Sequence, residues 1–258
     1  MTTPQKQEVT TQKPTEPTTP ERDIVLADID DTNGLMWYQF EEGEGASILT
    51  SSLSQPRDSI QFYGSLTYEG GIDNTGYAQF EEGEGIKLNN TFTDWGQIQD
   101  HTFLHPAARE LSVAFYMMPD SLDNTQMLFE YGSRYRGFAL GIEAGYLYVS
   151  ITASNSSETD GTQMPFDPIA LPENCTSEWT HIFFTYDGTL DGGTATVYIN
   201  FKKAAALSGV GGYLPKVLDA SGVATTDHGS NSLLWDAAYY SGKIDDLRIY
   251  KDGFTELP

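Results

Sequence analysis

Short runs in which every second residue is apolar constrain the fold of this chain more than any other feature. Residues 111–117 follow this pattern, and residues 138–142 and 147–151 repeat it on either side of Ala144-Gly145. A period of two is typical of a β-strand with one buried face, and the short glycine-containing gap predicts a hairpin. No stretch keeps a helical period, so the pattern predicts an all-β protein.

Residues 179–188 are bulky at both odd and even positions, which is typical of an inner strand of a two-layer sandwich. Turn residues such as Pro119-Asp120, Asp187-Gly188 and Gly211-Gly212 separate the apolar runs. Short, regularly spaced strands predict an antiparallel two-sheet β-sandwich of jelly-roll type. The polar stretch 154–178 is too long for a plain hairpin loop, so we expect a rim loop with some structure of its own.

Acidic residues dominate the charge of the chain. Fourteen basic residues against 37 acidic ones give a formal net charge of -23, which repels phosphate backbones and anionic lipid surfaces. We therefore expect no nucleic-acid partner and no membrane insertion. Cys175 is the only cysteine, which excludes an intramolecular disulfide and a cysteine-based zinc site. The N-terminus lacks the apolar core of a secretory signal, so export by such a signal is not expected.

Residues 1–22 differ from the rest in being rich in Thr and Pro, and their basic and acidic residues balance. This composition favours an extended arm without a core, ahead of a folded domain over residues 23–258. Two interpretations of the arm stay open. It is either a flexible linker or a segment that ties the domain to capsid or other assembly subunits.

Several longer motifs occur in an order that resembles one family. They are Trp37-Tyr38-Gln39-Phe40, Tyr77 to Glu81, Glu110 to Pro119, Met127 to Gly141, Trp179 to Gly188, Val197 to Asn200 and Gly242 to Tyr250. Their order resembles the laminin G-like, concanavalin A-like lectin and glucanase jelly-roll family over Leu35 to Leu257. The resemblance implies a binding module with no chemistry of its own. The family usually has Asn-Gly after the Val-Tyr strand, whereas here Phe201 follows Asn200.

Calcium is the cofactor that the resemblance implies, as a structural ion at the rim of the jelly roll. Closely spaced oxygen donors are what a hard cation requires. The expected ligands are Asp30, Asp31, Asp73 and Asp245. The alternative interpretation is that the first three are turn residues and that Asp245 caps backbone amides.

Carbohydrate is the ligand that the aromatic content favours, because sugars stack their apolar faces on aromatic rings beside planar polar groups. Aromatic residues near polar or basic neighbours form the candidate contacts. These are Tyr131, Arg134, Tyr135 and Arg136 in one cluster, with Trp95 and Trp235 in others.

Catalysis is not expected. Concanavalin-like hydrolases place two carboxylates at alternate positions of one strand. The nearest candidates, Glu42 with Glu44 and Glu82 with Glu84, stand beside glycines at strand ends, where side chains are held too loosely.

Taken together, these patterns predict a non-enzymatic recognition or adhesion module. The favoured setting is the exterior of a virus or phage particle, as a decoration or fibre protein attached through residues 1–22, with surface glycans as further partners. A carbohydrate-binding module of a secreted bacterial protein is the main alternative, and a polysaccharide hydrolase or lyase is the third. The predicted location is the virion surface or the extracellular space, and homo-oligomers are left open.

Overall fold

A computed structural model describes the following residues of the 258-residue chain: 28–30, 32, 34–53, 60–67, 69–87, 110–133, 136–153, 162–189, 192–212, 214, 222–225, 233–235, 238–250 and 253. The predicted arm over residues 1–22 lies outside the described residues. Within the described part, strands and turns make up the chain, with one short 3-10 turn, η1 (Ile72–Asn74). No helix in these ranges is long and apolar enough to cross a membrane.

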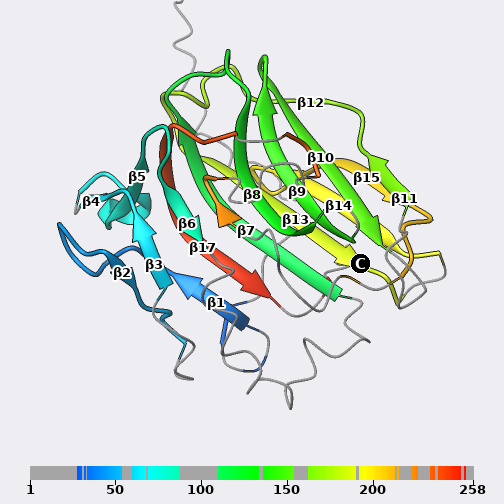
Figure 1. Cartoon of the computed structure of the whole chain (residues 1–258), viewed down its shortest axis with the longest axis horizontal. Coiled ribbons are helices and arrows are strands. Elements are labelled where there is room, and N and C mark those ends of the chain that lie inside the picture. The colour runs from blue at the N-terminus through cyan, green and yellow to red at the C-terminus, as the bar shows by residue number, and fades with distance from the viewer. Residues whose placement is uncertain are drawn as a thin grey trace, which may run out of the picture.

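The described strands form two antiparallel sheets (Figure 1). The first, called the eight-stranded sheet, contains in spatial order β15 (Lys202–Ser208), β14 (Thr194–Ile199), β13 (Thr180–Asp187), β7 (Glu110–Pro119), β17 (Gly242–Tyr250), β5 (Tyr77–Phe80) and β4 (Ser65–Thr67), with β1 (Gly34–Tyr38) also paired to β17.

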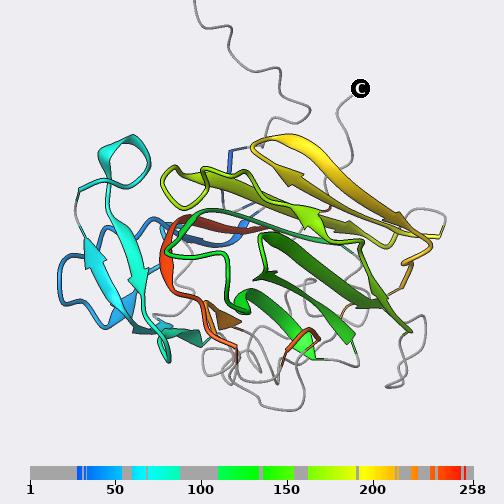
Figure 2. The ribbon, with the colours of Figure 1, turned by 90° about the horizontal axis from the view of Figure 1, so that it is seen from above.

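The second sheet, called the nine-stranded sheet, is assembled from both halves of the chain. It contains in spatial order β11 (Thr162–Pro165), β10 (Tyr146–Ala153), β9 (Arg136–Glu143), β8 (Gln126–Ser133), β16 (Gly222–Val223), β6 (Gly85–Lys87), β3 (Ile60–Tyr63) and β2 (Ile48–Leu49), with β12 (Ile169–Ala170) paired to β10. Figure 2 shows β13 to β15 (yellow) in one layer and β8 to β10 (green) in another.

The main hydrophobic core lies between the two sheets, and it contains the inward residues of β7, β9, β10 and β13. The strand β13 is buried along its whole length, as expected of an inner strand. Its β-branched and aromatic residues suit a pleated surface that is covered on both sides. The two-sheet sandwich that the alternation predicted is therefore confirmed.

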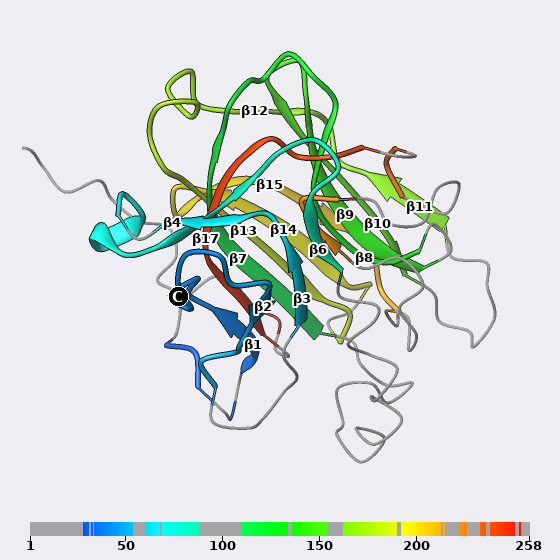
Figure 3. The same ribbon diagram turned by 60° about the vertical axis from the view of Figure 1, so that its left-hand side comes forward.

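The hairpin predicted around Ala144-Gly145 is also confirmed, because β9 and β10 pair antiparallel with Tyr146 opposite Glu143. The polar stretch 154–178 has structure of its own where it is described, namely β11, β12 and the turns that follow. Strands β1 to β5, drawn in blue to cyan, gather at one side of the sandwich beside β17 (Figure 3).

Candidate functional site

The outer face of the nine-stranded sheet carries aromatic residues on β10. The odd-numbered residues Leu147, Val149 and Ile151 are buried in the core between the sheets. Since successive side chains of a strand point to opposite faces, Tyr146 and Tyr148 face outward. Tyr146 is 43% exposed and Tyr148 is half-buried.

A short segment, residues 233–235, lies across this outer face and is held by two polar side chains. The Leu233 amide donates a hydrogen bond to Glu130 Oε1 at 2.8 Å, and Gln163 Nε2 donates to the Leu233 carbonyl at 2.7 Å. Gln163 Nε2 also reaches Ser150 Oγ at 2.8 Å. Leu233 packs in a small outer cluster with Met127, Ala139 and Ala238. The segment is thus fixed to the sheet at its start.

Trp235 follows in this segment, and its ring lies against Gly141 of β9. A Cβ atom built on Gly141 would stand only 2.1 Å from Trp235 Cζ3, so the close approach requires glycine here. The indole also meets Tyr148 edge to face, with ring centroids 5.6 Å apart. Trp235 is half-buried, and its Nε1–H has no acceptor among the described residues. A positioned indole with an uncommitted donor suits ligand contact.

We call Tyr146, Tyr148 and Trp235, with the neighbouring Gln163, the aromatic face. The rings offer apolar surface, and the indole N–H, the phenol groups and the amide offer hydrogen bonds. This combination is the one that carbohydrate recognition requires. Of these four residues the sequence predicted Trp235 and missed Tyr146, Tyr148 and Gln163.

The other predicted carbohydrate-contact residues do not join this face in the described part of the chain. Tyr131 is only 4% exposed and stacks on Phe138, with ring centroids 5.6 Å apart. Burial raises the pKa of its phenol well above the ordinary value. Its ring belongs to the core, so the expectation of an exposed Tyr131 is wrong. Arg136 begins β9, and its side chain is not described. The remaining candidates, Trp95, Arg134 and Tyr135, lie outside the described residues.

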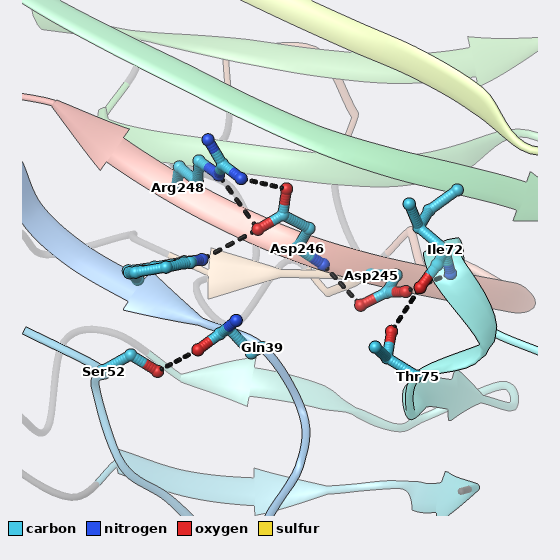
Figure 4. Close-up of polar contacts among 8 residues, drawn as sticks. Gln39, Ser52, Ile72, Thr75, Asp245, Asp246 and Arg248 are labelled. Atoms are coloured by element: carbon cyan, nitrogen blue, oxygen red, sulfur yellow. Dashed lines mark hydrogen bonds and ion pairs between the residues drawn. The ribbon is translucent and has the colours of Figure 1, made fainter. Parts of the chain in front are cut away.

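Asp245 is a buried carboxylate that holds a loop to β17 (Figure 4). Its Oδ2 accepts a hydrogen bond from the Ile72 amide at 2.7 Å, and its Oδ1 accepts one from the Asp246 amide at 2.7 Å. Burial raises its pKa to about 7, against the lowering effect of these two amides. This geometry matches the capping interpretation of Asp245. Asp73 follows Ile72 and is exposed, with a left-handed φ of 58°.

Two of the four predicted calcium ligands, Asp30 and Asp245, lie far apart along β17. The Gly34 amide donates to the Asp30 carbonyl, and Gly34 pairs with Tyr250. Tyr250 is five residues along β17 from Asp245, which corresponds to about 16 Å of strand. Asp31 lies outside the described residues. No group of three or more His, Cys, Asp or Glu side chains suited to a metal occurs in the described ranges.

Three oxygen atoms lie close to Gly71. A Cβ built on Gly71 would lie 2.3 Å from the Gly76 carbonyl oxygen, 2.6 Å from Asp245 Oδ2 and 2.7 Å from the Thr75 carbonyl oxygen. Carboxylate and carbonyl oxygens are the donor types that Ca²⁺ takes. Here Asp245 Oδ2 accepts the Ile72 amide and the Thr75 carbonyl accepts the Gly71 amide, so an ion at this position would share these oxygens with the two amides.

Asp246, next along β17, has a structural role that the sequence did not indicate. Its Oδ1 accepts hydrogen bonds from Trp37 Nε1 at 2.8 Å and Arg248 Nε at 2.9 Å, and its Oδ2 lies 2.8 Å from Arg248 Nη2. The Arg248 guanidinium also sits 5.3 Å from the Trp37 ring centroid. This closed network fastens β1 to β17.

The paired glutamates considered for glycoside cleavage are used differently where their bonds are recorded. Glu42 Oε1 accepts from the Thr50 amide at 2.7 Å, and Glu84 Oε2 accepts from the Glu81 amide at 2.8 Å. These bonds stabilise the two glycine-containing turns, which is a structural use of the side chains.

Together the two sheets and their core define a jelly-roll β-sandwich. The family model described as concanavalin A-like lectin/glucanases superfamily matches residues 88–256, and the chain belongs to this superfamily. The search of curated proteins found no match.

Solved structures of similar fold include two toxin domains and one enzyme accessory domain. The receptor binding domain of botulinum neurotoxin D has a TM-score of 0.57 and 14% identity, covering 86% of this chain and 50% of that one. The receptor binding domain of the botulinum neurotoxin C/D mosaic serotype has a TM-score of 0.54 and 14% identity, covering 88% of this chain and 49% of that one. Domain 4 of AbnA, an extracellular arabinanase of Geobacillus stearothermophilus, solved with arabinotriose, has a TM-score of 0.50 and 16% identity, covering 86% and 93%. The chain thus spans about half of each toxin domain, and at these identities the likeness is one of fold.

Proposed function

We propose that this protein is a non-enzymatic recognition module that binds carbohydrate through the aromatic face. The single observation that carries the proposal is Trp235, which lies against Gly141 and whose indole N–H has no acceptor in the part of the chain that the structure describes. A structural tryptophan would be expected to satisfy that donor within the protein. Superfamily membership, and the receptor-binding and arabinotriose-bound domains among the similar structures, support the same proposal.

Trp235→Ala tests it against a matched surface control. The protein is screened on a glycan array and a panel of polysaccharides, and each hit is measured by calorimetry. We expect Trp235→Ala to weaken binding by at least about tenfold, as loss of an aromatic contact does. Tyr63→Ala is the control, because Tyr63 is 41% exposed on β3, away from the aromatic face. Equal loss in both variants, or no bound glycan at all, would overturn the proposal.

The module is proposed to lack catalysis, since Glu42 and Glu84 are engaged in turns. Incubation with the same polysaccharides should release no reducing sugar above a heat-inactivated control. Release that disappears in Glu42→Gln or Glu82→Gln would instead establish a hydrolase or lyase.

A structural calcium ion is proposed beside Asp245, with carbonyl oxygens of residues 71–76 completing its shell. The ion would neutralise the buried carboxylate and fix the loop that carries Asp73. Calcium should raise the melting temperature of the wild type, with a much smaller rise in Asp245→Asn. Equal shifts in the two proteins would place the ion elsewhere.

Attachment through residues 1–22 to capsid or other subunits, on the exterior of a particle or in the extracellular space, belongs to the same proposal. It is supported by the Thr/Pro-rich composition of that segment. Deletion of residues 1–22 should leave glycan binding intact and abolish co-sedimentation with the particle. Co-sedimentation that persists after the deletion would assign the attachment to the β-sandwich. A separate light-scattering measurement on the free protein would reveal any homo-oligomer.

A further inference from the structure

We infer that the ligand of the aromatic face is an uncharged polysaccharide, bound along its length rather than at one end. This inference rests on the proposed function and specifies the class of glycan. It follows from the charged groups described near the aromatic face and from the exposure of its tyrosine rings.

No basic side chain is described beside the aromatic face. The basic side chains that the structure describes are Lys202 and Lys203 on β15 and Lys243 and Arg248 on β17, all in the eight-stranded sheet. Lys87 ends β6 of the nine-stranded sheet, three strands from β9, and its side chain is not described. Arg136 begins β9, but it lies five residues from Gly141, which is about 16 Å of strand. No described cation therefore stands beside Trp235 to pair with an anionic sugar.

The charged side chains recorded near the aromatic face are acidic. Glu130 is fully buried under the segment 233–235 and accepts the Leu233 amide. Glu143, half-buried, stands opposite the exposed Tyr146 in the β9–β10 pair. Its Oε1 accepts from Thr125 Oγ1 at 2.8 Å. A carboxylate-bearing sugar placed here would meet like charge in a chain of net charge -23, and such juxtaposition is strongly unfavourable.

The shape of the face favours the middle of a chain over its end. Gly141 and Ala139 of β9 are buried beneath residues 233–235, whereas Tyr146 and Tyr148 of β10 keep exposed surface. Tyr146 lies two residues along β10 from Tyr148, about 7 Å of strand, and is the more exposed ring. A site that recognises one terminal sugar encloses most of that sugar's surface. Rings spread over an open strand surface instead provide successive contacts to successive sugar units.

Hydrogen-bonding groups on the face are neutral. Gln163 holds Ser150 and Leu233 through its Nε2, which leaves the carbonyl oxygen of its amide as an acceptor for a hydroxyl group. The Trp235 indole N–H, without an acceptor among the described residues, is the matching donor. A donor and an acceptor without formal charge are complementary to sugar hydroxyls.

Two measurements on the full chain test the inference. Affinity gel electrophoresis compares uncharged polymers (arabinan, xylan and β-glucan) with anionic ones (polygalacturonate and hyaluronate). Calorimetry then follows oligosaccharides of increasing length from the polymer that retards the protein. We expect retardation by an uncharged polymer only, and affinity that rises at least about tenfold as the oligosaccharide lengthens, which is about 1.4 kcal/mol.

Tyr146→Ala separates chain binding from end binding without disturbing the core, because the side chain is 43% exposed. It should reduce the affinity for long oligosaccharides several-fold and so flatten the rise of affinity with oligosaccharide length. Binding of an anionic polymer that Trp235→Ala removes, or affinity independent of length, would overturn this inference and leave the proposed function intact. Absence of any Trp235-dependent binding would overturn both.

Discussion

Trp235 and Trp37 both lie on the outside of a sheet, yet they are held in opposite ways. Trp37 donates its indole N–H to Asp246, lies beside Arg248 and packs against the outer cluster of the eight-stranded sheet. Trp235 rests on Gly141, meets one ring edge to face and keeps its N–H without an acceptor in the described part of the chain. Trp37 is thus bonded into the fold through its indole N–H, whereas Trp235 is held in place by ring contacts.

An outward aromatic side chain therefore does not by itself mark a binding site. The two roles differ in whether the indole N–H donates a hydrogen bond within the protein. A donor with an internal acceptor contributes to stability, whereas a donor without one gains most from a ligand. Substitutions around Trp235 should therefore act on binding, and substitutions around Trp37 should act on stability.

Gly141→Ala should have the largest effect on binding and stability, because the Trp235 ring packs directly against Gly141. The new Cβ would stand 2.1 Å from Trp235 Cζ3 and 2.7 Å from the Gln126 carbonyl oxygen. We expect glycan binding to fall to background and the free energy of unfolding to drop by about 1–3 kcal/mol, as overpacking does. Calorimetry and urea unfolding measure the two quantities.

The double variant with Trp235→Ala sharpens this prediction. If the clash is mainly with the indole, Gly141→Ala should cost less stability in the Trp235→Ala background than in the wild type. Equal costs in the two backgrounds would show that the contact with the Gln126 carbonyl dominates, and that Gly141 does not specifically serve Trp235.

Asp246→Asn should have a similar effect on stability and none on binding. The amide retains one acceptor but presents N–H to Arg248, so a charge-assisted pair at 2.8 Å is lost. Loss of hydrogen bonds to a charged group should lower the free energy of unfolding by about 1–3 kcal/mol. Affinity for the glycan should stay within about twofold, a change below 0.5 kcal/mol. A large loss of affinity would break the contrast between the two tryptophans.

Asp245→Asn should change how stability depends on pH. The folded-state pKa of about 7 exceeds the ordinary value of 3.8, so the folded protein holds a proton that the unfolded chain releases between these pH values. The contribution of Asp245 to stability therefore falls as pH rises from about 4 to 7, by up to about 1.4 kcal/mol per pH unit. Melting temperatures in a chelator at pH 5, 6 and 7 should decline more steeply in the wild type than in the variant. Parallel curves would contradict the raised pKa.

Much of the fold could be predicted because its signals are local. The alternation in residues 138–142 and 147–151 defines the β9–β10 hairpin, and the bulky residues of 180–187 define the buried β13. Each pattern is complete within one strand or one turn, and tertiary contacts only confirm it.

The candidate site was harder, because distant segments build it. Gln163 and Leu233 are 70 positions apart, and Trp37 and Asp246 are 209 apart. The error at Tyr131 has a different cause. Its arginine neighbours in sequence suggested an exposed cluster, whereas Tyr131 lies on β8 opposite Phe138, and its ring packs in the core.

Substitutions in the turn at Asn200-Phe201 should have the smallest effect on stability. They compare a side chain that accepts a backbone hydrogen bond with one that only stacks on a neighbouring ring. Both residues have left-handed φ values, 50° and 66°. Phe201→Gly relieves that strain, worth about 1–2 kcal/mol, but it removes a ring stacked 4.2 Å from His181 and costs chain entropy. We expect the free energy of unfolding to change by less than about 1 kcal/mol, since a stacked pair contributes a similar amount.

Asn200→Gly is the matched variant, because Asn200 Oδ1 accepts the His181 amide at 2.9 Å. Loss of this hydrogen bond should lower the free energy of unfolding by about 1 kcal/mol, a typical net hydrogen-bond contribution. Urea unfolding that ranks Phe201→Gly as the more damaging change would show that the ring stack, rather than the polar contact, holds this turn.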